Sequence, residues 1–226
     1  TLDVSFYKIA SFELVDIPLV KYTAAKGKPM IISTGMGSLG EIEEAVKAVR
    51  TQGNNDICLL KCSSAYPAIP ADMNLATLEV LKKLFDCAVG FSDHSMGSVA
   101  AIAAVAMGAK VIEKHFCLSR QIENPDASFS MEPHEFKRMV EDIREAEKAM
   151  GKIDFSVSEK ESESRIFRKS IFVVRDVLKG ESFTPDNIRV IRPGYGLLPK
   201  HYEEIIGKKA SRDVTRGMPL EWIHVE

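Results

Sequence analysis

The sequence has few cysteines and no long hydrophobic run. Its four cysteines form no C-x-x-C pair and are too sparse for a disulfide scaffold, so we expect reduced, mostly buried thiols. No apolar run approaches the roughly 20 residues that a membrane-spanning helix needs. The first residues also lack the basic and hydrophobic regions of a signal peptide. We therefore expect a cytoplasmic protein that does not bind a membrane.

The sequence also lacks a strong excess of charge of one sign. Its formal net charge is −2, with 30 lysines and arginines against 32 aspartates and glutamates. The protein therefore has no overall basic field, and we expect neither nucleic acid nor an anionic membrane as a partner. A small anionic substrate would need a local cationic pocket.

Short apolar segments alternate with helical patterns through residues 1–150. This alternation is typical of parallel strands covered by helices. The expected strands, each ending in polar residues, are residues 4–9, 29–34, 57–62, 88–92 and 110–115. The expected helices are residues 16–25, 39–52, 75–85, 98–107 and 133–150. Because active sites of parallel α/β folds lie at the carboxyl ends of the strands, the polar residues there are candidates for chemistry.

The pattern changes after residue 150. Residues 151–166 are polar and rich in charge, with too little apolar surface to pack, and we interpret them as a linker. Residues 167–226 combine a short apolar run with several turn signals, such as Lys179-Gly180, which indicates a small, mainly β module. A chain of 226 residues is long enough for one large domain and one small domain.

Two histidines lie at the carboxyl ends of consecutive expected strands. In a parallel sheet, His94 and His115 would lie at the same edge and could share a divalent metal ion. Asp93 and Glu113 could then accept hydrogen bonds from the rings and orient them. The alternative is that each histidine is an ordinary hydrogen-bonded side chain, since no His-x-x-x-His pattern supports a metal site.

Hydroxyl groups and one lysine follow the same strand ends. Together they would place one ammonium group and several hydroxyls around a pocket suited to a phosphate or a carboxylate. These residues are Lys8, Ser11, Ser33, Ser64 and Ser92. Serines after strands also commonly cap turns and helices, so each one alone is a weak signal. The sequence has no glycine-rich nucleotide-binding motif, which argues against a nucleotide.

One loop of the small module is a candidate for recognition. Residues 192–196 (RPGYG) place the cation of Arg192 near an aromatic ring and two glycines. Loops of this kind often contribute to binding sites. The alternative is a solvated turn.

Segments along nearly the whole chain resemble the sialic acid synthase family. They are residues 7–13 (YKIASFE), 32–36 (ISTGM), 60–67 (LKCSSAYP), 90–95 (GFSDHS) and 112–116 (IEKHF). Within the family, KIASFE, KCSSAYP and EKHF are most similar to pseudaminic acid synthases. The resemblance implies an α/β fold: the C-terminal part of a (β/α)8 TIM barrel in residues 1–150 and, after the linker, an antifreeze-like SAF domain in residues 167–226. A closed barrel needs eight strands, so we expect roughly three β/α units, with the family's catalytic glutamate, upstream of residue 1.

The resemblance also implies roles for the candidate residues. His94 and His115 would bind a divalent metal ion, usually manganese, with magnesium or cobalt as substitutes. The residues that would hold phosphoenolpyruvate are Lys8, Ser11, Ser33, Ser64 and Ser92. The residues on the side of the sugar would be Tyr66, Glu113 and Asp126, although residues 124–126 (NPD) depart from the family's usual Gly-Pro-Asp. Lys8 and Glu113 are the expected catalytic residues.

The implied partners are two substrates and a second copy of the chain. Arg192 matches an arginine that enters the active site of a partner subunit, which implies a domain-swapped homodimer. The implied reaction joins phosphoenolpyruvate to an N-acetylated amino sugar, 2,4-diacetamido-2,4,6-trideoxy-altrose, and gives a nine-carbon 2-keto sugar acid and phosphate. The alternatives are an N-acetylneuraminate or legionaminate synthase with the same chemistry, and a non-catalytic fragment of such an enzyme.

Overall fold

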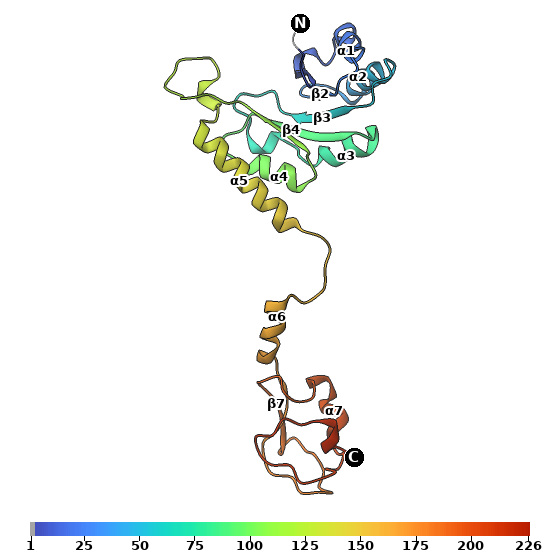
Figure 1. The fold of residues 1–226 in the computed structure, drawn as a ribbon, viewed down its shortest axis with the longest axis vertical. Coiled ribbons are helices and arrows are strands. Elements are labelled where there is room, and N and C mark those ends of the chain that lie inside the picture. The colour runs from blue at the N-terminus through green and yellow to red at the C-terminus, as the bar shows by residue number, and fades with distance from the viewer. Residues whose placement is uncertain (1–2) are drawn as a thin grey trace. The chain divides into compact units, whose positions relative to one another are not determined.

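Five parallel strands form one sheet in the first part of the chain (Figure 1). The structure is a computed structural model, and it describes residues 3–226. The strands are β1 (Tyr7–Ile9), β2 (Met30–Ser33), β3 (Ile57–Cys62), β4 (Ala88–Asp93) and β5 (Val111–Lys114). Each strand pairs in parallel with the next one along the chain, in the order β1-β2-β3-β4-β5. This order is that of successive β/α units of a barrel, and it confirms the five strands expected from the sequence.

Helices connect the strands and cover one side of the sheet. They are α1 (Ile17–Ala24), α2 (Leu39–Arg50), α3 (Thr77–Phe85), α4 (Val99–Ala106) and α5 (Pro133–Met150). A capping box begins α2: the Glu41 amide donates to the Ser38 hydroxyl at 3.3 Å, and the Ser38 amide donates to the Glu41 carboxylate at 2.7 Å. Gly151 follows the end of α5 with a φ of +50°, a backbone conformation that favours glycine. Local sequence signals therefore set where α2 begins and where α5 ends.

Alternate residues of each strand face opposite sides of the sheet. The side covered by the helices buries a large apolar cluster, which includes Ile9, Ile32, Leu59 and Phe91. The residues between these positions, such as Lys8 and Ser92, therefore face the other side. In the paired register, Ser92 is level with Cys62 of β3 and with Glu113 of β5. The side without helices thus carries Lys8, Ser92 and Glu113.

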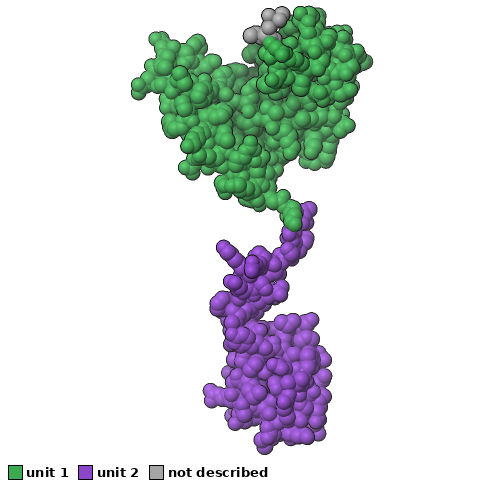
Figure 2. All heavy atoms as spheres, viewed as in Figure 1, with its two compact units in different colours: residues 1–152 green, residues 153–226 purple. Residues whose placement is uncertain are grey.

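A second compact unit begins at Ile153 (Figure 2). Its elements are α6 (Glu159–Glu163), β6 (Ser170–Val173), β7 (Ile188–Ile191) and α7 (Tyr202–Ile205). β6 and β7 pair antiparallel, and the unit has its own core around Ile171, Phe183 and Leu220, each fully buried. The segment expected as a linker, residues 151–166, contains α6, whose first turn is capped by the Ser158 hydroxyl.

The structure also bears on the cysteines and on membrane spans. Cys58 and Cys62 are buried, Cys87 and Cys117 are half-buried, and all four are free thiols, as expected. Among residues 3–226, no helix combines the length and the apolar character needed to cross a membrane.

Gly90 of β4 lies so close to the neighbouring strands β3 and β5 that there is no space for a side chain. A Cβ atom there would be 2.4 Å from the Val111 carbonyl oxygen and 2.5 Å from Cδ2 of Leu60. We expect Gly90→Ala to lower the free energy of unfolding by about 1–3 kcal/mol, because overpacking forces the backbone to shift. Urea denaturation followed by circular dichroism measures the change. Gly40→Ala is the control, since nothing lies within 4 Å of a Cβ atom there. Equal stability of the two variants would contradict this prediction.

Candidate active site

The Glu113 carboxylate contacts side chains from two other strands, β4 and β1. One of its oxygens accepts a hydrogen bond from the Ser92 hydroxyl at 2.7 Å, and the other lies 3.5 Å from the ammonium nitrogen of Lys8. Lys8 belongs to β1 and Glu113 to β5, which are the first and last strands of the sheet. A contact between the edge strands requires the sheet to curl, as the wall of a barrel does. The structure therefore brings the two predicted catalytic residues together.

His94 and His115 are neighbours at the ends of β4 and β5. Their ring centroids are 5.2 Å apart. His94 is 7% exposed, and its Nδ1 lies 2.8 Å from the carbonyl oxygen of Ser63, so that Nδ1 carries the proton and donates it. Nδ1 of His115 lies 3.4 Å from a carboxylate oxygen of Asp126. In both rings Nε2 thus remains as the possible ligand atom, and that of His94 lies 3.5 Å from the Ser92 hydroxyl oxygen.

The environment of His94 shifts its pKa and that of a neighbouring thiol. Burial acts to lower the pKa of His94, but hydrogen bonds to Cys62 and to the Ser63 carbonyl raise it overall. Burial acts to raise the pKa of the Cys62 thiol, but hydrogen bonds with His94 and Ser11 lower it overall. The Cys62 sulfur is 3.9 Å from Nδ1 of His94. Cys62 is a site residue that sequence reasoning missed, although it ends β3 level with Ser92.

Aromatic rings form a wall beside the histidines. The Tyr66 ring centroid is 4.2 Å from that of His94, 5.7 Å from that of His115 and 5.5 Å from that of Phe129. Burial, followed by the nearby negative charges of Cys62 and Asp126, raises the pKa of the Tyr66 hydroxyl. Tyr66 and Asp126 were predicted for the sugar side. Phe129 was missed, because a lone aromatic residue in a loop has no pattern that points to a site.

The serines cluster around Gly35, which follows the end of β2. The Gly35 amide donates to the Ser11 hydroxyl at 3.1 Å. A Cβ atom at residue 35 would lie 2.3 Å from the Ser64 hydroxyl oxygen and 2.7 Å from that of Ser11, so only glycine leaves this space open. The Ser33 hydroxyl is buried and has no hydrogen-bond partner among the described residues. These hydroxyls could donate hydrogen bonds to the oxygens of an anion.

Asp93 does not lie beside a histidine ring, contrary to the expectation from the sequence. It lies on the helix-covered side of β4, where its carboxylate accepts hydrogen bonds from the Lys114 ammonium at 2.8 Å and from the Ser95 amide at 2.8 Å. Both charged side chains are almost fully buried, with exposures of 1% for Lys114 and 0% for Asp93. The idea that Asp93 orients a histidine ring is therefore wrong. The pair instead joins the ends of β4 and β5 directly behind the two histidines.

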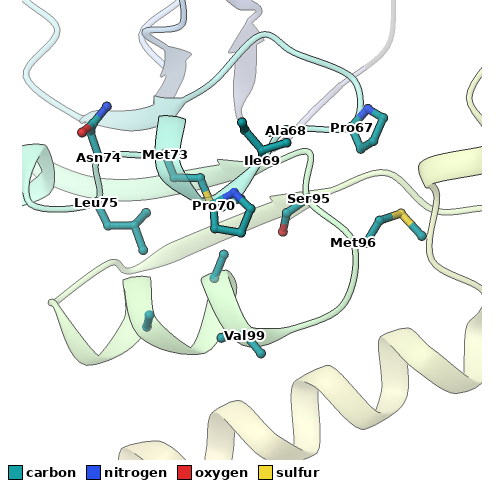
Figure 3. Close-up of a pocket in the computed structure, with 12 residues that line it drawn as sticks. Pro67, Ala68, Ile69, Pro70, Met73, Asn74, Leu75, Ser95, Met96 and Val99 are labelled. Carbon is teal, nitrogen blue, oxygen red and sulfur yellow. The ribbon is translucent and has the colours of Figure 1, made fainter.

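An apolar cavity of about 500 Å³ lies beside the loops that follow β3 and β4 (Figure 3). Its walls are residues 67–70 and 73–75, Ser95, Met96 and the first turns of α4. The Ser95 hydroxyl is buried and without a hydrogen-bond partner in the described part of the chain. The Ala68 amide donates to the His94 carbonyl oxygen at 3.0 Å, which ties the loop after β3 to the end of β4.

Arg192 belongs to the second unit. It follows β7 and its side chain is exposed. Its predicted role in a substrate site remains a prediction.

Comparisons with known proteins assign the chain to a family. Residues 1–155 match the NeuB family, and residues 168–226 match the SAF domain. The chain belongs to the NeuB family. It is 44% identical to a pseudaminic acid synthase of Campylobacter jejuni, over 95% of this chain and 63% of that protein. It is 37% identical to an N,N'-diacetyllegionaminic acid synthase of Legionella pneumophila, over 100% of this chain and 65% of that protein.

A solved structure is similar to the chain over nearly its whole length. The spore coat polysaccharide biosynthesis protein SpsE of Bacillus subtilis matches with a TM-score of 0.62 and 36% identity, over 98% of this chain and 67% of that one. Together with the strand order, the family confirms the predicted fold class, strands of a (β/α)8 TIM barrel followed by an SAF domain. The chain spans 63% of the length of the Campylobacter jejuni relative.

The buried ion pair behind the histidines makes a testable contribution to stability. Lys114→Met keeps a side chain of similar length but leaves the Asp93 carboxylate buried without its cation. We expect the free energy of unfolding to fall by about 3–5 kcal/mol, the usual cost of removing one partner of a buried pair. Thermal and urea denaturation measure the loss. Lys110→Met, at an exposed position just before β5, is the control and should be nearly neutral. A Lys114 variant as stable as this control would refute the account of the pair.

Proposed function

We propose that the protein acts as a pseudaminic acid synthase. It would condense phosphoenolpyruvate with 2,4-diacetamido-2,4,6-trideoxy-altrose to give a nine-carbon 2-keto sugar acid and phosphate. The observation that carries the proposal is that the Lys8–Glu113–Ser92 group and the paired histidines His94 and His115 share one side of the sheet. The similarity to a pseudaminic acid synthase supports the choice of sugar. The proposed place of the reaction is the cytoplasm.

A divalent metal ion belongs to the proposal, with manganese first and magnesium or cobalt as possible substitutes. His94 and His115 would hold it through Nε2, because both Nδ1 atoms face oxygen acceptors. Within the described residues, no group of three or more His, Cys, Asp and Glu side chains could bind a metal. Two histidine ligands leave positions for water and substrate, as a catalytic site requires. When bound, the ion would polarise the aldehyde oxygen of the open-chain sugar.

The residues of the chain would position the two substrates. Lys8 supplies a cation for phosphoenolpyruvate, and the hydroxyls of Ser11 and Ser64, together with the unpaired hydroxyl of Ser33, supply hydrogen bonds to its oxygens. Tyr66, with Asp126 nearby, would contact the sugar. Such fixed donors cost no reorganisation when charge develops in the reaction.

The proposed reaction forms one carbon–carbon bond and releases phosphate. The methylene carbon of phosphoenolpyruvate attacks the aldehyde carbon of the sugar, and the aldehyde oxygen takes up a proton. Water then adds to the cationic carbon that bears the phosphate. The tetrahedral intermediate collapses by breaking the carbon–oxygen bond to phosphate, which leaves the 2-keto acid. Glu113, which binds both Lys8 and Ser92, would keep the ammonium group aimed at the reacting anion.

Two other functions stay open as alternatives. A legionaminate or N-acetylneuraminate synthase would use the same residues on another sugar, and the similarity to a legionaminic acid synthase favours this alternative. Turnover of the three amino sugars by the same preparation would separate these activities. A protein that binds sugar without turnover is the third possibility, and an assay for released phosphate would distinguish it from an enzyme.

The proposed metal site predicts the effect of removing either histidine. In the full-length protein, His94→Ala or His115→Ala should weaken manganese binding by more than about 100-fold, since even the loss of an outer partner costs 10–100-fold. Metal-dependent turnover should disappear in both. Electron paramagnetic resonance of free manganese gives the affinity, and phosphate release gives the turnover. His134→Ala is the control, because that side chain is 76% exposed on α5. Unchanged manganese affinity in either site variant would exclude the ligand assignment.

The proposal includes a domain-swapped homodimer in which Arg192 completes the site of the partner. Mixing a His115→Ala protein with an Arg192→Ala protein, both of full length, should then restore activity. In a heterodimer of this kind, one site carries both lesions and the other carries none. Activity should rise above the sum of the two separate variants after subunit exchange. Complete exchange, verified by native mass spectrometry, without recovered activity would show that Arg192 does not act across subunits.

A further inference from the structure

A hollow of about 620 Å³ on the second unit is lined by four cationic side chains. They are Arg168, Lys169, Arg192 and Lys200. The remaining walls come mainly from apolar groups, such as Phe167 and Leu198, and no carboxylate lines the hollow. Four positive charges around one hollow repel one another, which costs free energy unless an anion binds among them.

None of the four cations has a partner within residues 3–226. No ion pair or side-chain hydrogen bond involves them in this part of the chain, whereas Lys208 of the same unit lies 3.5 Å from the Glu204 carboxylate. The guanidinium and ammonium groups therefore keep their donors free. Two arginines offer paired N–H groups that match the oxygens of a phosphate or a carboxylate.

Backbone contacts hold the cationic segments together. Ser170 of β6 pairs with Ile191 of β7, so Lys169 and Arg192 leave the same end of the two-stranded sheet. The Gly194 amide donates to the Ile166 carbonyl oxygen at 2.8 Å, which fastens the loop after β7 to the segment before β6. A Cβ atom at residue 194 would lie 2.9 Å from the Arg165 carbonyl oxygen, so this close approach requires glycine.

A second backbone hydrogen bond positions Lys200, the last of the four cations. The Ile171 amide of β6 donates to the Leu197 carbonyl oxygen at 2.9 Å, which places the turn that contains Lys200 beside the same end of the sheet. Three separate segments thus bring charge to one place on a backbone held by hydrogen bonds. A fixed arrangement of this kind differs from scattered surface lysines and arginines.

We propose that this hollow is a binding site for a small anion that carries a phosphoryl or carboxylate group. Phosphoenolpyruvate carries both groups, and phosphate is the second product of the proposed reaction. The identification of these two molecules as the natural ligands rests on the proposed function, whereas binding of a phosphoryl anion does not. With a formal net charge of only −2, the chain as a whole provides no attraction for such anions, so a local site is needed to concentrate them.

Titration of the 226-residue chain with inorganic phosphate tests the site. Amide chemical shifts of the chain, recorded by NMR at low ionic strength, should move at Lys169, Arg192 and Gly194 and should saturate. An Arg168→Gln/Lys200→Gln double variant should bind phosphate about tenfold more weakly, because two of the four charge-assisted contacts are lost. The matched control is Arg175→Gln/Arg216→Gln, which removes the same charge from exposed positions of the same unit outside the hollow. The control should bind phosphate as the unaltered chain does.

The outcomes separate this site from the proposed function. Equal weakening in both double variants would mean that only overall charge attracts phosphate, and the site would be refuted. If the amide shifts at the hollow instead change when the protein concentration is raised without phosphate, the hollow binds an acidic surface of a second copy of the chain. This outcome also refutes a small-anion site. Saturable phosphate binding with no preference for phosphoenolpyruvate over sulfate would support the anion site but reject phosphoenolpyruvate as its ligand. None of these measurements needs turnover, so an inactive chain would leave the result intact.

Discussion

The contact between Lys8 and Glu113 exists only because the sheet is strongly curled, and the rest of the site depends on the same curl. Their strands are the two edges of the sheet, yet the charged atoms are 3.5 Å apart. In a flat sheet, edge strands separated by four spacings of roughly 4.8 Å would be about 19 Å apart. The right-handed twist of strands and the consistent hand of β/α crossovers turn each strand in the same sense. The curl therefore directs polar side chains from both edges toward one another.

The alternation of side chains along each strand separates the core from the site. Asp93 and His94 are adjacent in sequence and face opposite sides, and so do Lys114 and His115. Asp93 and Lys114 form the buried ion pair, whereas the rings of His94 and His115 lie next to each other on the other side. A shift of β5 by one residue would exchange the two groups and bury a histidine against α4 and α5. The apolar cluster beneath the helices thus holds the register on which the histidine pair depends.

Backbone groups prepare the site before any ligand binds. The Ser63 carbonyl selects the ring nitrogen of His94 that carries the proton, and Gly35 leaves room for the hydroxyls of Ser11 and Ser64. Such groups move little, so they can hold a substrate without first being reorganised. The second unit follows the same principle. Because Gly194 has no side chain, the loop that contains Arg192 can lie against the backbone at Arg165.

The sequence by itself determined the five strands, the helices between them and most of the polar residues at the strand ends. These follow from local periodicity, capping residues and motif resemblance, which are properties of short segments. It did not reveal Cys62, Gly35 or Phe129 as parts of the site, and it placed Asp93 beside a histidine. Which side chains meet depends on register, on alternation across the sheet and on curl, which are set by contacts between residues far apart in the chain. Only the tertiary structure decided that Asp93 pairs with Lys114 while Glu113 joins Lys8 and Ser92.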